Sequence, residues 1–90
     1  MEALNKKLYN AAKSGNIDLV QDCLQKGADV HYKDIRGQTP LHKAALMGST
    51  AVTRVLVEAG ASLSAVDNAG KTTHDLAQDN VKKLLQVVTF

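Results

Sequence analysis

The stretch Thr39-Pro40-Leu41-His42-Lys43-Ala44-Ala45-Leu46-Met47-Gly48 decides the fold of this chain of 90 residues. Thr39 suits a helix N-cap, and Pro40 suits the first helical position because its missing N–H has no intrahelical partner there. Leu41, Ala44 and Ala45 share one face of the predicted helix. Gly48 ends the helix, because the residue after a helix terminus often adopts the left-handed conformation that glycine tolerates. The stretch therefore predicts a short helix with one apolar face.

The chain resembles itself at an offset of 33 residues. Comparison of residues 8–37 with residues 41–70 gives eight identities in thirty positions: Leu8/Leu41, Ala11/Ala44, Ala12/Ala45, Gly15/Gly48, Gly27/Gly60, Ala28/Ala61, Asp34/Asp67 and Gly37/Gly70. Most of these are glycines, alanines and aspartates, which turns and close helix packing require. A fixed period of this length indicates a stacked repeat architecture.

A second helix and a turn complete each unit. Apolar residues recur at helical spacing at Ile17, Val20 and Leu24 in the first unit and at Val52, Val55 and Leu56 in the second. Gly27 and Gly60 end these helices. Asp34-Ile35-Arg36-Gly37 and Asp67-Asn68-Ala69-Gly70 place Asp first and Gly fourth, as a type I β-turn prefers. Each unit is therefore predicted to be an antiparallel helix pair followed by a protruding turn tip.

These motifs together strongly resemble the ankyrin repeat. Residues 39–70 carry nearly the full pattern, residues 4–37 resemble an N-terminal capping repeat without the Thr-Pro start, and residues 71–90 resemble a truncated C-terminal cap. The resemblance implies an all-α solenoid of stacked antiparallel helix pairs with protruding β-turn tips. It also implies that the His42 imidazole hydrogen-bonds turn backbone and keeps adjacent repeats in register. We expect a single domain over residues 1–90, with units of about 4–37, 38–70 and 71–90.

The third unit departs most from the repeat pattern. Thr72-Thr73-His74 stands where Thr-Pro-Leu is expected, so the repeat register predicts that His74 faces the core. A buried neutral histidine would destabilise this unit in acid, and His74→Leu would then raise the melting temperature. A final amphipathic helix is still predicted, because apolar residues keep helical spacing at Val81, Leu84, Leu85 and Val88. We expect low local stability at this end of the stack.

Composition and charge exclude several classes of function. Eleven Lys and Arg against nine Asp and Glu give a net charge of +2, and only three residues are aromatic, so we expect no nucleic-acid partner. The single cysteine, Cys23, excludes an intramolecular disulfide and a multi-cysteine metal site, and its register predicts a small buried hydrophobe. No stretch has the pattern of a signal peptide or a membrane span, so we expect a cytoplasmic protein without membrane association.

No group of residues indicates catalysis or cofactor binding. His31, His42 and His74 are 11 and 32 residues apart, which lacks the short spacing of helical metal ligands. The aspartates belong to predicted turns or to a solvated helix face, and no glycine-rich loop could hold a phosphate. We therefore expect no enzymatic activity, no metal and no cofactor.

The candidate functional residues lie on the turn tips and on the exposed face of the first helix of each unit. The resemblance implies that partners are contacted there. Ile35 at a turn tip and Leu46-Met47 at a helix end predict an exposed apolar patch, and Lys43 is among the basic residues expected near it. Such a rim favours an acidic or mixed protein surface. The predicted protein-binding residues are Lys13, Ser14, Lys33, Ile35, Arg36, Gln38, Leu46, Met47, Asn68 and Lys71.

The sequence thus favours a non-catalytic module that binds a folded protein partner, as a scaffold or an inhibitor. A second hypothesis is self-association through apolar residues of the C-terminal helix, namely Val87, Val88 and Phe90. A third is that the chain is a fragment of a longer ankyrin array. We expect a monomer, with a weak homodimer as the alternative.

Overall fold

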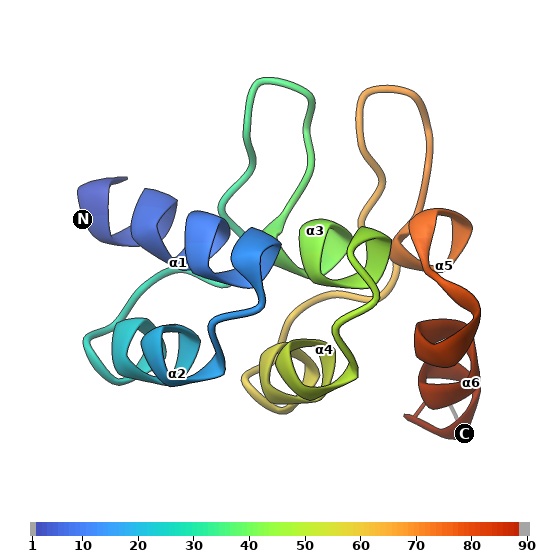
Figure 1. The fold of residues 1–90 in the computed structure, drawn as a ribbon. Coiled ribbons are helices and arrows are strands. Elements are labelled where there is room, and N and C mark those ends of the chain that lie inside the picture. Colours follow the sequence, from blue (N-terminus) through green and yellow to red (C-terminus); the bar gives the residue numbers. More distant parts are fainter. Residues whose placement is uncertain (1, 89–90) are drawn as a thin grey trace.

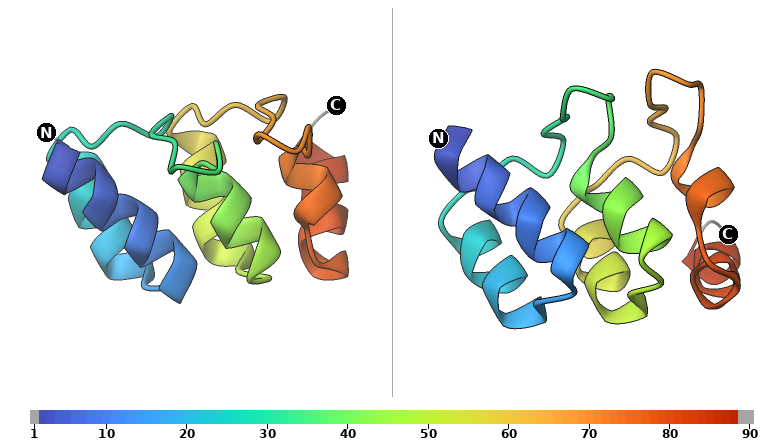
Figure 2. Two further views of the ribbon diagram at one scale, coloured as in Figure 1. Left: turned by 90° about the horizontal axis from the view of Figure 1, so that it is seen from above. Right: turned by 45° about the horizontal axis from the view of Figure 1, so that its top comes forward.

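The computed structural model describes residues 2–88, with side chains given through Leu85. This part of the chain forms six helices: α1 (Glu2–Ser14), α2 (Ile17–Gln25), α3 (Pro40–Leu46), α4 (Thr50–Glu58), α5 (Thr73–Leu76) and α6 (Asp79–Val88). Helices α1, α3 and α5 lie side by side in one layer, and α2, α4 and α6 form a second layer (Figures 1 and 2). Helix α3 packs against both α1 and α5, and α4 packs against α6. This arrangement confirms the predicted all-α ankyrin solenoid.

The expected signals begin and end α3, and a serine cap begins α4. The Thr39 side chain accepts a hydrogen bond from the His42 N–H and so caps α3, with Pro40 at its start. Gly48 follows the helix in the left-handed conformation, with φ of 77°. The Ser49 side chain then caps α4 by accepting from the N–H of Val52. The two helices can therefore follow each other after a very short connection.

The core consists of small aliphatic side chains from both layers. The first cluster unites the first two helix pairs through buried Leu8, Ala11, Ala12, Val20, Cys23, Leu41, Ala44, Val52, Leu56 and Ala61. Cys23 is fully buried, as predicted. A second and smaller cluster holds α5 and α6 against α3 through Ala45, Ala77, Val81 and Leu85. Among the side chains that the structure describes, the C-terminal pair therefore contributes fewer to the buried apolar core than the first two pairs do.

Two long loops project beyond the helices, next to each other on the same edge of the stack (Figure 1). The first joins α2 to α3 and the second joins α4 to α5. Each ends in the predicted turn, because the Gly37 N–H donates to the Asp34 carbonyl and the Gly70 N–H to the Asp67 carbonyl, both at 2.9 Å. These two turns are called the first tip, residues 34–37, and the second tip, residues 67–70.

The prediction for His74 is wrong, because its side chain is exposed. Helix α5 has only four residues, and its described contacts are with α3 and α6. Those contacts bury Thr73 and Ala77 and leave the His74 side chain uncovered. The acid sensitivity and the stabilisation by His74→Leu that followed from its burial are therefore not expected.

Helix α5 nevertheless begins with a complete capping box. The Thr72 Oγ1 atom accepts from the Asp75 N–H, and the Asp75 carboxylate accepts from the Thr72 N–H at 2.9 Å. That backbone hydrogen bond lowers the pKa of Asp75. This capping box compensates in part for the lack of a proline at the first position of α5, where α3 has Pro40.

Candidate protein-binding surface

The carboxylate of Asp34 holds the first tip in shape. Its Oδ1 atom accepts hydrogen bonds from the N–H groups of Arg36 and Gln38, each at 2.9 Å. Its Oδ2 atom accepts from the Tyr9 hydroxyl, so helix α1 is tied directly to the tip. Burial works against ionisation, but these three hydrogen bonds outweigh it and lower the pKa of Asp34. Both carboxylate oxygens are therefore occupied within the protein.

Tyr9 contributes to this network from a half-buried position on α1. Burial and the hydrogen bond to Asp34 raise the pKa of the Tyr9 hydroxyl above its usual range. The ring of Tyr32 contacts the Tyr9 ring edge-on, with centroids 5.9 Å apart. No local sequence pattern points to this role of Tyr9, since its partner lies 25 positions away and only the packing of α1 brings the two residues together.

Asp67 has the same role in the second tip. Its Oδ1 atom accepts from the N–H groups of Ala69 and Lys71, each at 2.9 Å. Its Oδ2 atom accepts from the side-chain amide of Gln38 at 3.2 Å. The hydrogen bonds from Lys71 and Gln38 lower the pKa of Asp67. The carboxylates of both tips thus stay ionised, and their oxygens are engaged in hydrogen bonds within the protein.

Asn68 joins the two tips to each other. Its backbone N–H donates to the Arg36 carbonyl at 2.8 Å, and its side-chain amide donates to the Ile35 carbonyl at 3.0 Å. Gly37 lies so close to Asn68 that a Cβ atom on the glycine would be 2.6 Å from the Asn68 Oδ1 atom. Because of these contacts the tips form a single surface instead of two independent loops.

His42 connects the central helix to the base of the second loop, as expected. Its Nδ1 atom accepts the Thr39 N–H at 3.1 Å, so Nε2 carries the hydrogen that is donated to the Lys71 carbonyl at 3.2 Å. The ring is fully buried. This bond links α3 to the start of the following repeat and sets the position of Lys71.

The structure places most of the predicted binding residues on the surface, with two exceptions. Leu46 is half-buried, and Gln38 is 91% buried because its side chain packs under the tips and hydrogen-bonds Asp67. Lys43 is also buried, and its charge contributes to the low pKa of Asp34. The exposed members are Lys13, Ser14, Lys33, Ile35, Arg36, Met47, Asn68 and Lys71. Ile35 is 94% exposed and Met47 57%, which is unusual for apolar side chains of this size.

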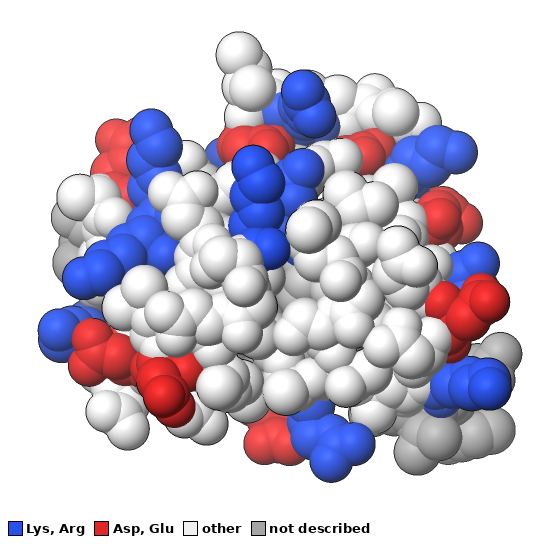
Figure 3. All heavy atoms as spheres, viewed as in Figure 1, with Lys and Arg blue, Asp and Glu red and all other residues white. Residues whose placement is uncertain are grey.

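Charged and uncharged side chains are separated on the face that Figure 3 shows. Lys and Arg side chains gather at the base of the first loop, above α1 and α3, and a broad surface without charged groups continues below them over these helices. The aspartates of the tips take part in internal hydrogen bonds. A partner approaching this face therefore meets a cluster of basic side chains beside a broad uncharged surface.

A groove of about 430 Å³ lies between the tips. Ile35 and Arg36 line it from the first tip, and Asn68 and Ala69 from the second. Gln38 and Asp67 complete its lining. It is the hollow between the two joined tips, and Ile35, the most exposed large apolar side chain among the described residues, stands at its edge.

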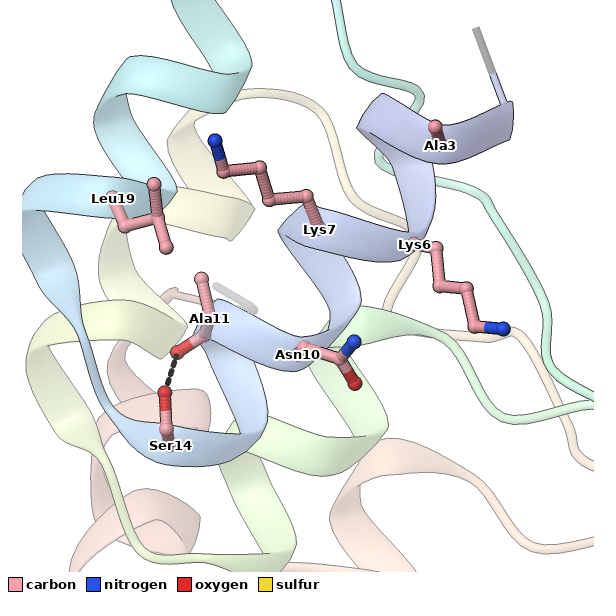
Figure 4. Close-up of a pocket in the computed structure, with 7 residues that line it drawn as sticks. All are labelled: Ala3, Lys6, Lys7, Asn10, Ala11, Ser14 and Leu19. Atoms are coloured by element: carbon pink, nitrogen blue, oxygen red, sulfur yellow. Dashed lines mark hydrogen bonds between the residues drawn. The ribbon is translucent and has the colours of Figure 1, made fainter.

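A second groove, of about 400 Å³, lies on the outer edge of α1 and α2 (Figure 4). Lys7 extends beside Leu19 at this groove, and Lys6 extends away from it. At the repeat offset, Lys6 and Lys7 correspond to Thr39 and Pro40, which are buried in the helix that packs against α1. The lysines give this edge the polar character that the end of a repeat stack requires.

Other kinds of site are not found in the part of the chain that the structure describes. Within residues 2–88 there is no group of three or more His, Cys, Asp or Glu side chains that could hold a metal ion. No helix in the same residues has the length and hydrophobicity needed to cross a membrane. The surface expected for self-association, Val87, Val88 and Phe90, lies outside the residues whose side chains are described.

Comparison with known proteins agrees with this geometry. The family model described as "Ankyrin repeats (many copies)" matches residues 8–57, more than half of the chain. The chain belongs to the ankyrin-repeat family. The match covers most of the first unit and part of the second, and ankyrin repeats mediate protein–protein interaction.

Three relatives illustrate where such ankyrin repeats occur. Human protein phosphatase 1 regulatory subunit 27 is 35% identical over 80 residues, which cover 89% of this chain and 52% of the relative. Mouse protein phosphatase 1 regulatory subunit 12A is 34% identical over 79 residues, covering 88% of this chain and 8% of the relative. Mouse diacylglycerol kinase iota is 44% identical over 75 residues, which cover 79% of this chain and 7% of the relative. This ankyrin-repeat chain thus spans about half of the first relative and a small part of the others.

The names of the relatives agree with a binding module. Two of these relatives are named as regulatory subunits. The similarity to the kinase covers 7% of that enzyme and reflects shared ankyrin repeats. A protein-binding module is therefore the class of function that family membership supports.

Proposed function

We propose that this ankyrin-repeat protein binds a folded protein partner through its two tips and the adjoining surface of α1 and α3. The observation that carries the proposal is the joined pair of tips, which presents a fully exposed Ile35 beside Arg36 on a rigid base. Rigid presentation matters because little conformational entropy is lost when such a surface binds. Exposed Met47 lies at the end of α3 and extends the apolar contact.

Inhibition or scaffolding follows from what the protein covers on its partner. The regulatory-subunit names of two relatives make control of another enzyme by binding a consistent role for this chain. We place this role in the cytoplasm, where a single buried thiol remains reduced. In this proposal the protein acts as a monomer, and self-association is weak.

Affinity capture tests the proposed surface. Wild type and the variant Ile35→Ala, Arg36→Ala, Leu46→Ala, Met47→Ala are used to capture proteins from a lysate of the source organism, followed by mass spectrometry. Because Leu46 is half-buried, the triple variant that keeps Leu46 separates loss of contact from loss of stability. We expect a protein that wild type enriches and both variants lose, while the melting temperature of the triple variant stays near that of wild type.

A matched control changes four exposed residues of the other layer: Asp18→Ala, Gln21→Ala, Arg54→Ala and Glu58→Ala. This variant should capture the same protein as wild type. Equal capture by wild type and the tip variants would contradict the proposed surface. A mass above that of the monomer in light scattering over a range of concentrations would instead support self-association.

A further inference from the structure

The groove between the tips combines three features that point to the chemistry of its ligand. Its lining includes an exposed cation, Arg36, and an exposed aliphatic side chain, Ile35. It also includes Gln38, which is 91% buried. The inference drawn from these features rests on the proposed function and specifies which part of a partner the tips would bind.

Arg36 is the one cation of the groove lining and Asp67 its one carboxylate, and the oxygens of Asp67 are already engaged within the protein. All four carboxylate oxygens of Asp34 and Asp67 accept hydrogen bonds from Tyr9, from Gln38 or from backbone N–H groups. Arg36 forms no ion pair with any residue that the structure describes. Its guanidinium therefore remains available to a carboxylate on a partner, with which it can form two parallel hydrogen bonds.

A hydrogen-bond acceptor of the groove lining is also unused. The amide of Gln38 donates to Asp67 through Nε2, and its Oε1 atom is buried without a hydrogen-bond partner among the described residues. Buried polar atoms are nearly always hydrogen-bonded, so an unpaired acceptor in a groove marks a place where a ligand can supply a donor. A backbone N–H of an extended chain is such a donor.

We propose that the groove binds an extended acidic segment of the partner protein. A carboxylate of the segment pairs with the Arg36 guanidinium, and a neighbouring apolar side chain packs against Ile35. A backbone N–H of the segment donates to the Gln38 Oε1 atom. The recognition element is thus an Asp or Glu next to an aliphatic residue, in a chain extended enough to lie between the two tips.

A library of random dodecapeptides displayed on phage tests this inference with the full chain of 90 residues. We expect the enriched peptides to share an acidic residue beside Leu, Ile or Val. A synthetic peptide with that motif should bind about tenfold more weakly to the Arg36→Ala variant, as expected for loss of a hydrogen-bonded charge pair. It should also shift the NMR signals of the Gln38 side-chain amide. Panning against Arg36→Glu should enrich basic peptides instead.

Arg54→Glu serves as the matched control, because Arg54 is exposed on α4 in the other layer and its reversal changes the net charge equally. This variant should bind the acidic peptide nearly as well as wild type. Enrichment without acidic residues, no enrichment at all, or equal weakening by Arg54→Glu would overturn the inference. If the tip variants still lose the captured protein in that case, the proposed function stands and only the acidic-segment assignment fails. Equal capture by wild type and the tip variants would overturn both.

Discussion

Single side chains decide the shape of the tips. In Asp34 and Asp67, one carboxylate oxygen accepts hydrogen bonds from backbone N–H groups of the residue's own turn. The other oxygen accepts from a residue outside the turn. The outside partner is Tyr9 for Asp34 and Gln38 for Asp67. The turn motif therefore does more than reverse the chain, because it anchors each tip to the helices below it.

Removal of the Tyr9 hydroxyl should loosen the first tip. Tyr9→Phe takes away the hydrogen bond to Asp34, and we expect a loss of about 1 kcal/mol in the free energy of unfolding. Urea denaturation measures this loss. Tyr32→Phe is the control, because the Tyr32 hydroxyl forms no hydrogen bond within the described residues, and its effect should be close to zero. Equal effects of the two variants would show that the Tyr9 hydroxyl does not hold the tip.

The same aspartates predict how stability depends on pH. Their pKa values are lower in the folded protein than in the unfolded chain, so their contribution is present above the unfolded value of about 4. It is lost as the pH falls through the folded values. We expect the melting temperature to decline below about pH 4. Asp67→Asn should lower the melting temperature at neutral pH and reduce the additional drop in melting temperature in acid.

Exposed Asp18 on α2 provides the comparison for this acid titration. Asp18→Asn should leave the melting temperature at neutral pH and the acid decline nearly as in wild type. A wild-type melting temperature that stays constant to about pH 2 would contradict the role given to the turn carboxylates.

Turns and helices show how one repeat motif acquires different environments. Gly37 and Gly70 occupy equivalent positions with nearly equal φ, 78° and 76°. A Cβ atom at Gly37 would meet Asn68, whereas a Cβ atom at Gly70 would meet nothing within 4 Å. Substitution at the two glycines therefore distinguishes two effects: the strain of a side chain at positive φ, which both share, and the contact with Asn68, which only Gly37 makes.

Alanine at these two positions should have unequal effects. Gly70→Ala should lower the free energy of unfolding by about 1 kcal/mol, because alanine is strained in the left-handed conformation. Gly37→Ala introduces the same strain and also displaces Asn68. We therefore expect a loss of about 2 kcal/mol or more in the free energy of unfolding. Chemical denaturation of both variants measures the difference. Equal losses would mean that Asn68 moves away at no cost and that the tips are not interlocked.

Helix α5 keeps the cap of its predecessor but not the proline. Thr73 takes the place of Pro40, and its hydroxyl is buried without a hydrogen-bond partner among residues 2–88. The preceding Thr72 has φ of −86° and ψ of 171°, which a following proline allows. Thr73→Pro should therefore raise the free energy of unfolding by about 0.5–1 kcal/mol, as seen in the melting temperature.

Thr73→Val serves as the control, since it removes the unpaired hydroxyl and leaves the backbone unrestricted. It should stabilise the protein less than proline does. A lower melting temperature for Thr73→Pro would show that the start of α5 differs from the start of α3 in its backbone requirement.

At the scale of the whole stack, the two ends are expected to differ in stability, because the described core consists of one large and one small cluster. Val52 and Val81 are both fully buried, but Val52 belongs to the large cluster and Val81 to the small one that holds α6. Repeat proteins gain stability from each interface between neighbours, so the end with the smaller interface opens first.

Hydrogen exchange should reveal this gradient. In wild type we expect faster amide exchange in α5 and α6 than in α1 and α3. Val52→Ala should cost about 2 kcal/mol and reduce protection throughout the stack, whereas Val81→Ala should reduce it mainly in α5 and α6. Uniform loss of protection in both variants would indicate that the three helix pairs unfold together.

The repeat, the helix pairs and the turns could be read from the chain alone, because each depends on local chemistry: a Thr-Pro helix start, glycine after a helix, and Asp and Gly in a turn. The exposure of Ile35 at a turn tip followed from the same local pattern. The outward position of His74 did not, because repeat register assumes that every unit has neighbours, and the one-turn helix α5 leaves that side uncovered.

The candidate binding groove required the tertiary structure. Gln38 is adjacent in sequence to the first tip but is buried by Asp67, 29 positions further along, and Tyr9 reaches Asp34 across 25 positions. Such contacts depend on the distance between stacked units, which no local sequence pattern contains. Local patterns thus determine which elements form, whereas the packing of one repeat on the next determines which side chains remain available to a partner.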